Sequence, residues 1–166
     1  FAQGDITHVL FNFAGITREE DFEVTIRVGA QNHAFGLYAN LGAALRGDPS
    51  IKAIVLLSRQ ADGSRATEQD IRKYLDEAGI ENIDHRVVFV KERFKAELKT
   101  CLFIRDLFLV RDHQTILLPK EFDNSLNRPR VTRFSDVRKM AAALGMRVEQ
   151  SSLVFEGGDL LFAGRT

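Results

Sequence analysis

The sequence predicts an α/β fold assembled from strand-strand-helix-strand modules. Within residues 107–150, two short apolar runs flank a tight polar turn, and a helix-like segment and another short strand pattern follow. Residues 9–58 can be read in the same order, as two strands, a helix and a strand. A succession that recurs along a chain indicates repeated units, each of which buries its apolar face against its neighbours.

The first half of the chain supplies the elements of one such unit. Residues 22–28 alternate apolar and polar side chains and predict a strand, as does the apolar run at 9–13. Residues 34–45 predict a helix, and Gly47-Asp48-Pro49 ends it. The apolar run at 52–58 predicts a buried strand.

A helix over residues 67–78 is predicted from both of its ends. Thr67 can cap it, and Asp70, three residues later, completes a capping-box-like pair. Gly79 ends the helix, and a strand at 86–90 follows.

The second half predicts a complete module. Its elements are a strand at 107–111, a turn at 112–114, a strand at 115–118, a polar loop at 120–132, a helix at 136–144 and a strand at 147–150. Ser135 is the expected helix cap, and Gly145 ends the helix.

Composition excludes several classes of protein. The 166 residues fit one domain, and we expect a single domain over 1–166. The 23 basic and 23 acidic residues cancel, which gives no electrostatic basis for binding nucleic acid or a membrane surface. No apolar run approaches the roughly 20 residues of a membrane-spanning helix. A single cysteine fits a reducing compartment, so we expect a cytoplasmic protein.

Carboxylates at predicted strand starts are the first candidates for chemistry. Asp106 precedes one apolar strand pattern, and the sequence Glu156-Gly-Gly-Asp159 precedes another. Paired carboxylates can hold a guanidinium group through bidentate hydrogen bonds, bind a metal ion, or act as acid and base. The structural alternative is that Asp106 pairs with Arg105 while Glu156 and Asp159 satisfy turn amides.

Other reactive residue types give weaker indications. Arg128, Arg130 and Arg133 lie in or just after the polar loop and can hold an anionic substrate group or can be solvated surface residues. Cys101 precedes an apolar run, which is more typical of a buried side chain than of a nucleophile. The four histidines are scattered without metal-ligand spacing, and no phosphate-binding glycine motif is present.

Two segments together resemble the guanidino-group-modifying enzymes of the pentein superfamily. They are residues 100–106 (TCLFIRD) and 155–165 (FEGGDLLFAGR). The superfamily includes arginine deiminases, dimethylarginine dimethylaminohydrolases, agmatine deiminases and amidinotransferases. The resemblance covers about residues 67–166 and leaves 1–60 unassigned. It implies a five-bladed α/β propeller of strand-strand-helix-strand units around a polar centre.

The resemblance also implies roles for individual residues. Asp106 would hold the substrate guanidinium, with Glu156 as a second carboxylate and Asp159 in the same motif. Arg133, or failing that Arg130, would hold a substrate carboxylate. No cofactor and no metal would be needed.

In the superfamily, a cysteine thiolate attacks the guanidinium carbon and a histidine moves protons. Both would follow Thr166, so we expect the catalytic residues outside this chain. The expected function is a hydrolase acting on a C–N bond of a small guanidino compound. The alternatives are an amidinotransferase, a non-catalytic binding domain of the same fold, or an unrelated α/β domain whose acidic residues are structural.

Overall fold

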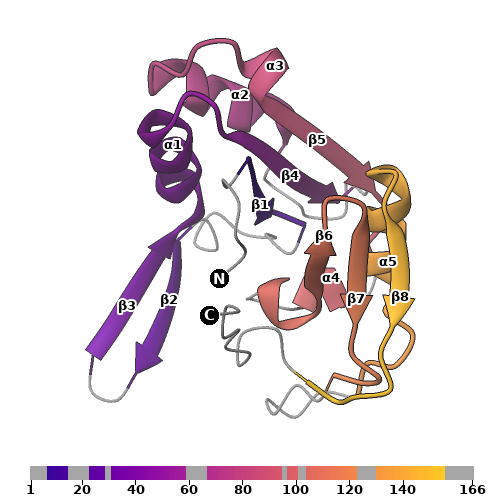
Figure 1. Ribbon diagram of the computed structural model, residues 1–166. Coiled ribbons are helices and arrows are strands. Elements are labelled where there is room, and N and C mark those ends of the chain that lie inside the picture. Colours follow the sequence, from indigo (N-terminus) through magenta and orange to yellow (C-terminus); the bar gives the residue numbers. More distant parts are fainter. Residues whose placement is uncertain are drawn as a thin grey trace, which may run out of the picture. The chain divides into compact units, whose positions relative to one another are not determined.

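A computed structural model describes most of the chain and divides it into two compact units (Figure 1). The described residues are 7–14, 23–28, 31–58, 67–94, 97–100, 104–122 and 130–155. One unit is Ile6–Arg93, and the other contains Phe94–Thr166. Both units combine helices with small sheets, which confirms the α/β class.

The unit Ile6–Arg93 is built on a three-stranded parallel sheet in the order β1-β4-β5. Its strands are β1 (His8–Asn12), β4 (Lys52–Ser58) and β5 (Val87–Glu92), and its helices are α1 (Leu37–Gly47), α2 (Glu68–Glu77) and α3 (Ile83–Arg86). The predicted strands at 9–13, 52–58 and 86–90 are therefore confirmed to within two residues. The single-turn helix α3 was not predicted.

Helices α1 and α2 pack against one face of this sheet. Residues of β4 at every second position share that face, and they join buried side chains of both helices in one apolar cluster. The cluster includes Leu41, Leu45, Ala53, Val55, Leu57, Ile71 and Leu75. Burial of these side chains is the main source of stability of this unit.

A β-hairpin precedes α1 and corrects one prediction. Strands β2 (Glu23–Val28) and β3 (Gln31–Gly36) pair antiparallel, with Val28 opposite Gln31. The helix predicted at 34–45 therefore begins only at Leu37, because residues 31–36 take their hydrogen bonds from β2. Local propensity at 34–36 is overridden by this pairing.

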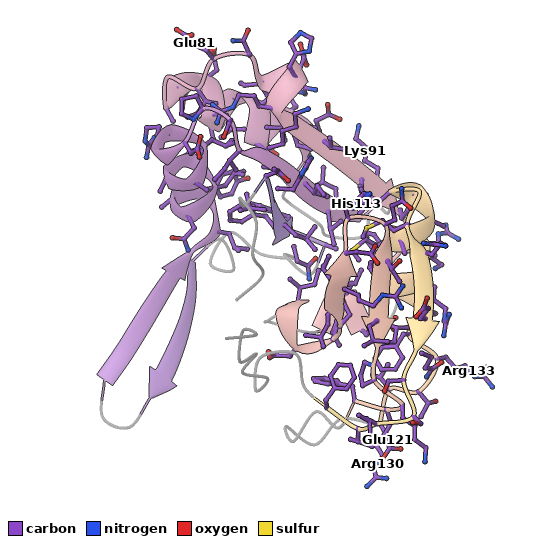
Figure 2. The ribbon with its side chains drawn as sticks, in the orientation of Figure 1. Glu81, Lys91, His113, Glu121, Arg130 and Arg133 are labelled. Carbon is purple, nitrogen blue, oxygen red and sulfur yellow. The ribbon has the colours of Figure 1, made fainter. Side chains whose placement is uncertain are left out.

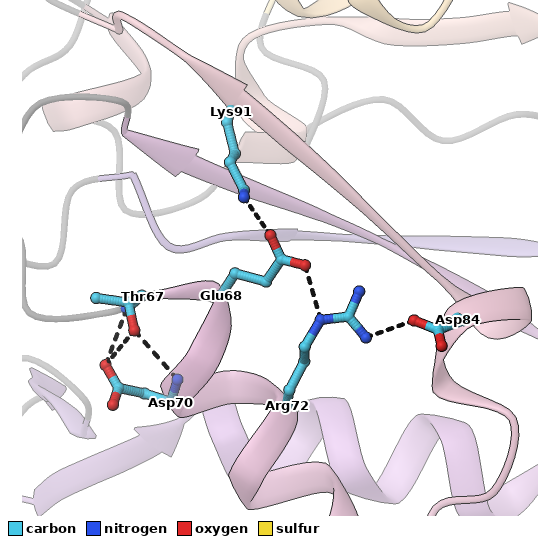
Figure 3. Close-up of polar contacts among 6 residues, drawn as sticks. All are labelled: Thr67, Glu68, Asp70, Arg72, Asp84 and Lys91. Carbon is cyan, nitrogen blue, oxygen red and sulfur yellow. Dashed lines mark hydrogen bonds and ion pairs between the residues drawn. The ribbon is translucent and has the colours of Figure 1, made fainter.

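Polar contacts hold the start of α2 and the end of α1. At α2, Thr67 Oγ1 accepts from the Asp70 N–H at 3.1 Å, and Asp70 Oδ2 accepts from the Thr67 N–H at 3.1 Å, which confirms the capping box (Figure 3). After α1, Arg86 Nη2 donates to the carbonyl oxygens of Leu45 at 2.7 Å and Asp48 at 2.8 Å. Arg86 thereby satisfies carbonyl groups that a helix end leaves unpaired.

The unit that contains Phe94–Thr166 includes the predicted module. Its elements are α4 (Glu97–Thr100), the 3-10 helix η2 (Ile104–Asp106), β6 (Leu109–Asp112), β7 (Thr115–Leu118), α5 (Ser135–Ala143) and β8 (Arg147–Gln150). The sheet order is β6-β7-β8, with β6 antiparallel and β8 parallel to β7 (Figure 1). The strand-strand-helix-strand order predicted for this region is confirmed.

The first 58 residues do not repeat this pairing. There, β1 pairs in parallel directly with β4, and the β2–β3 hairpin forms a separate sheet between them in the sequence. The order therefore contains one strand more than predicted. The two regions share a succession of apolar patterns, but their strands pair differently.

The helices of the described residues are short. The longest is α1 with 11 residues, and none of those described is long and apolar enough to cross a membrane.

Candidate functional site

Asp106 lies at the end of η2, just before the chain enters the sheet of its unit. The Leu107 N–H donates to the Ile104 carbonyl at 3.1 Å and closes this turn. Leu107 and Phe108 are buried, while Asp106 is half-buried. The strand begins only at Leu109, so the prediction that Asp106 immediately precedes it is wrong by two residues. The buried pair Leu107-Phe108 fixes the backbone beside the carboxylate.

A second acidic residue, Asp112, ends strand β6 and has a structural role. Asp112 Oδ1 accepts from the Gln114 N–H at 2.8 Å in the turn between β6 and β7. This backbone hydrogen bond is the main cause that lowers the pKa of Asp112 below its ordinary value. Asp112, at the end of β6, is therefore a carboxylate with a structural role that can be compared with Asp106, which precedes the strand.

Several residues named from the sequence lie outside the described part of the chain. They are Glu156, Asp159, Cys101, Arg128 and the side chain of Arg105. The expected pairing of Asp106 with a second carboxylate, and the alternative pairing with Arg105, both remain predictions.

The polar loop between β7 and α5 is closed at its base by a two-residue bridge. Phe122 and Val131 exchange backbone hydrogen bonds at 2.9 Å in each direction. Beside this bridge, Arg130 Nη1 lies 3.2 Å from Glu121 Oε1. Arg130 is thus held by an ion pair within the protein.

Arg133 differs from Arg130 in its surroundings. Its side chain is exposed and extends outward from the ribbon in Figure 2. Within the described part of the chain, its guanidinium group has no hydrogen-bond or ion-pair partner, whereas its backbone carbonyl accepts from Arg138 Nε at 3.1 Å. Arg133 therefore combines a fixed backbone with an exposed guanidinium group.

Gln150, at the end of β8, holds the backbone on both sides of the loop. Its Nε2 donates to the carbonyl oxygens of Lys120 at 3.2 Å and Thr132 at 3.3 Å, and its Oε1 accepts from Arg138 Nη2 at 2.8 Å. No local pattern indicates this role, because the carbonyl groups of Lys120 and Thr132 lie 30 and 18 residues away.

The start of α5 is held by a residue that sequence analysis missed. The N-cap is Phe134, which has a positive φ of 46°, and Ser135 is the first helical residue and not the cap. Instead, Glu97 Oε1 accepts from the backbone N–H groups of Asp136 at 2.5 Å and Val137 at 3.2 Å. Glu97 is only 3% exposed. A carboxylate at this position pairs the free amides of the first turn and is favoured by the helix dipole.

A second group of charged residues lies in the unit Ile6–Arg93, around the start of α2 (Figure 3). Glu68 forms ion pairs with Lys91 and with Arg72 Nε, the latter at 2.7 Å, and Arg72 Nη1 lies 2.7 Å from Asp84 Oδ1. The hydrogen bond from Lys91, followed by that from Arg72, lowers the pKa of Glu68 below its ordinary value. Each of these four charges therefore has a partner inside the group.

No cluster of three or more His, Cys, Asp or Glu side chains that could hold a metal ion occurs among the described residues.

No protein-family profile, curated protein or solved structure matches this chain.

Proposed function

We propose that this chain binds a small guanidino compound through Asp106, as the substrate-binding portion of a hydrolase that acts on a C–N bond of that compound. The observation that carries the proposal is the position of Asp106. A half-buried carboxylate ends η2 and is followed by two buried residues at the entrance to a strand-strand-helix-strand module.

A carboxylate in this position suits a guanidinium group. The guanidinium is planar, carries its charge at every accessible pH and donates in a fork that matches the two oxygens of a carboxylate. Partial burial strengthens such a pair, because the local dielectric is lower than that of water. The residues beside Asp106 are packed in the core, so little ordering of the backbone would accompany binding.

Arg133 is the better of the two arginines for a carboxylate on the ligand. Arg130 is already paired with Glu121, whereas Arg133 has no such partner among the described residues. A ligand with a guanidinium at one end and a carboxylate at the other, such as arginine, would carry a partner for each of Asp106 and Arg133.

The remaining parts of the proposal rest on the resemblance. The module would be one blade of a five-bladed propeller, and Glu156 and Asp159 would complete the binding site. A cysteine thiolate would attack the guanidinium carbon, a histidine would transfer protons, and water would release the product. Asp106 would hold the guanidinium in place for that attack.

Calorimetric titration with arginine tests the proposal. Asp106→Asn keeps the size of the side chain and removes its charge, so the affinity for arginine should fall about tenfold or more. Asp112→Asn is the matched control, since it removes the same charge from the last residue of β6 and should leave the affinity within about twofold. Equal affinity of wild type and Asp106→Asn, or an equal loss in both variants, would contradict the assignment.

A further inference from the structure

We infer that the outer edge of β2 is a docking surface for a second copy of this chain, through antiparallel pairing of β2 with the same strand of that copy. In the part of the chain that the structure describes, β2 (Glu23–Val28) pairs with β3 alone, and the hairpin forms a sheet of two strands (Figure 1). The inference concerns assembly and does not depend on the proposed ligand.

The backbone groups on this edge follow from the register of the hairpin. Val28 lies opposite Gln31 with two residues between them in the chain, so this closing pair is hydrogen-bonded. Hydrogen-bonded and non-hydrogen-bonded pairs alternate along an antiparallel ladder, so every second residue of β2 turns its N–H and C=O groups away from β3. The residues with outward backbone groups are Glu23, Thr25 and Arg27.

An edge of this kind favours the addition of a strand. A sheet of two strands is marginally stable in water, and a row of unpaired N–H and C=O groups is a template for pairing with another chain. Natural edge strands are often blocked by lysine or proline, and β2 (EVTIRV) contains neither. Four of its six residues are β-branched, a residue class that favours strands.

The charges of β2 favour a second copy as the added strand. Glu23 and Arg27 lie symmetrically about Thr25, two positions to either side. When two copies pair antiparallel with Thr25 opposite Thr25, each Glu23 lies opposite Arg27 of the other copy, and these are the residues whose backbone groups point outward. Opposite charges in directly facing positions stabilise a sheet. The edge is therefore complementary to itself, as a two-fold symmetric interface requires.

Other pairings of the hairpin are less favourable. A parallel pairing in register would set Glu23 beside Glu23 and Arg27 beside Arg27, and facing like charges are destabilising. Strand β3 (QNHAFG) has no acidic residue, lysine or arginine to form such pairs, and α1 begins directly after it at Leu37. Antiparallel pairing through β2 gives a sheet of four strands, two from each copy, which is enough for independent stability.

Sedimentation velocity of the full chain, at protein concentrations from about 1 μM to about 1 mM, tests the inference. We expect wild type to approach twice the mass of one chain as the concentration rises. Glu23→Arg makes the facing residues all positive and Arg27→Glu makes them all negative, so each variant alone should dimerise about tenfold or more weakly. The control is Glu81→Arg, which reverses the charge of an exposed residue outside the hairpin and should change dimerisation by less than about twofold.

A further variant acts on the backbone of the same edge. Thr25→Pro removes an outward N–H group that the pairing of β2 with β3 does not use. It should therefore weaken dimerisation by about tenfold or more, while the circular dichroism spectrum stays that of wild type.

An equal mixture of Glu23→Arg and Arg27→Glu tests the register itself. One variant supplies two arginines and the other two glutamates, so a mixed pair regains both opposite-charge contacts and should dimerise within about threefold of wild type. A wild type that stays monomeric throughout, or a dimer that none of the β2 variants weakens, would overturn the inference. Two weakened variants that do not recover on mixing would overturn the antiparallel pairing.

Discussion

Glu97 Oε1 and the backbone nitrogen of Asp136 lie 2.5 Å apart, although 39 residues separate them in the chain. The first turn of α5 is therefore completed by a side chain of α4. This contact joins α4 to α5 within one compact unit.

The stability of this unit should depend on Glu97 and not on Ser135. Glu97→Ala leaves two buried amides without their acceptor, so the free energy of unfolding should fall by about 1–3 kcal/mol in urea denaturation. Ser135→Ala, at an exposed residue without a capping hydrogen bond, should change it by less than about 0.5 kcal/mol. Equal effects of the two substitutions would show that Glu97 does not cap α5.

Arg86 should resist replacement by lysine. Its Nη2 reaches the carbonyl oxygens of both Leu45 and Asp48, and a lysine ammonium cannot reproduce the geometry of the guanidinium. We expect Arg86→Lys to lower the free energy of unfolding by about 1–2 kcal/mol. Lys73→Ala, which removes a surface ion pair with Glu77 at 3.9 Å, is the control and should cost less than about 0.5 kcal/mol.

Glu68 should make stability depend on pH in the acid range. Its pKa is lower in the folded protein, because Lys91 and then Arg72 hydrogen-bond to its charged form. The stabilisation is therefore present above the pKa of the unfolded state and is lost as the pH falls through the folded pKa.

The test is the difference in unfolding free energy between wild type and Glu68→Gln, measured from about pH 7 down to about pH 3. We expect the difference to be largest near neutrality and to close at the acid end. The control is Glu77→Gln, whose carboxylate pairs at the surface with Lys73. A difference that stays constant or grows on acidification would contradict this assignment.

Tyr38 should ionise only in strong alkali. Burial, with a smaller effect of the nearby Asp70 charge, raises its pKa to about 12. The chain has two tyrosines and no tryptophan, so Tyr74→Phe leaves Tyr38 as the single phenol for ultraviolet titration. We expect a midpoint near pH 12 in the folded protein and near about pH 10 in denaturant.

The same shift has a consequence for stability. Because the folded pKa of Tyr38 is raised, its contribution to stability is present below the unfolded pKa and is lost as the pH rises toward the folded value. Tyr38→Phe should remove that alkaline loss. A folded-state midpoint near pH 10 would mean that the phenol is solvated.

Elements defined by neighbouring residues could be predicted from the sequence. The capping box of α2 joins Thr67 to a residue three positions away, and its prediction is confirmed. The corresponding prediction for Ser135 is wrong, because Glu97 supplies the acceptor from 39 positions upstream. The helix predicted at 34–45 starts late for the same reason, since the hairpin partner of residues 31–36 lies in β2.

In the candidate site, too, features set by neighbouring residues could be predicted, and contacts between residues remote in the sequence could not. Asp106 was identified from its place before an apolar run, and the structure puts it at the end of η2 before buried residues. The choice between Arg130 and Arg133 depends on the ion pair with Glu121, which no local pattern reveals. Gln150 and Glu97 were missed because each acts on backbone groups that are remote in the sequence.

A crystal structure of the protein soaked with arginine tests the central claim most directly. We predict the guanidinium within hydrogen-bond distance of Asp106, at about 2.7–3.0 Å between nitrogen and oxygen. We also predict the carboxylate of the ligand on Arg133. Arginine bound elsewhere on the chain, with Asp106 in contact only with protein groups, would contradict the account.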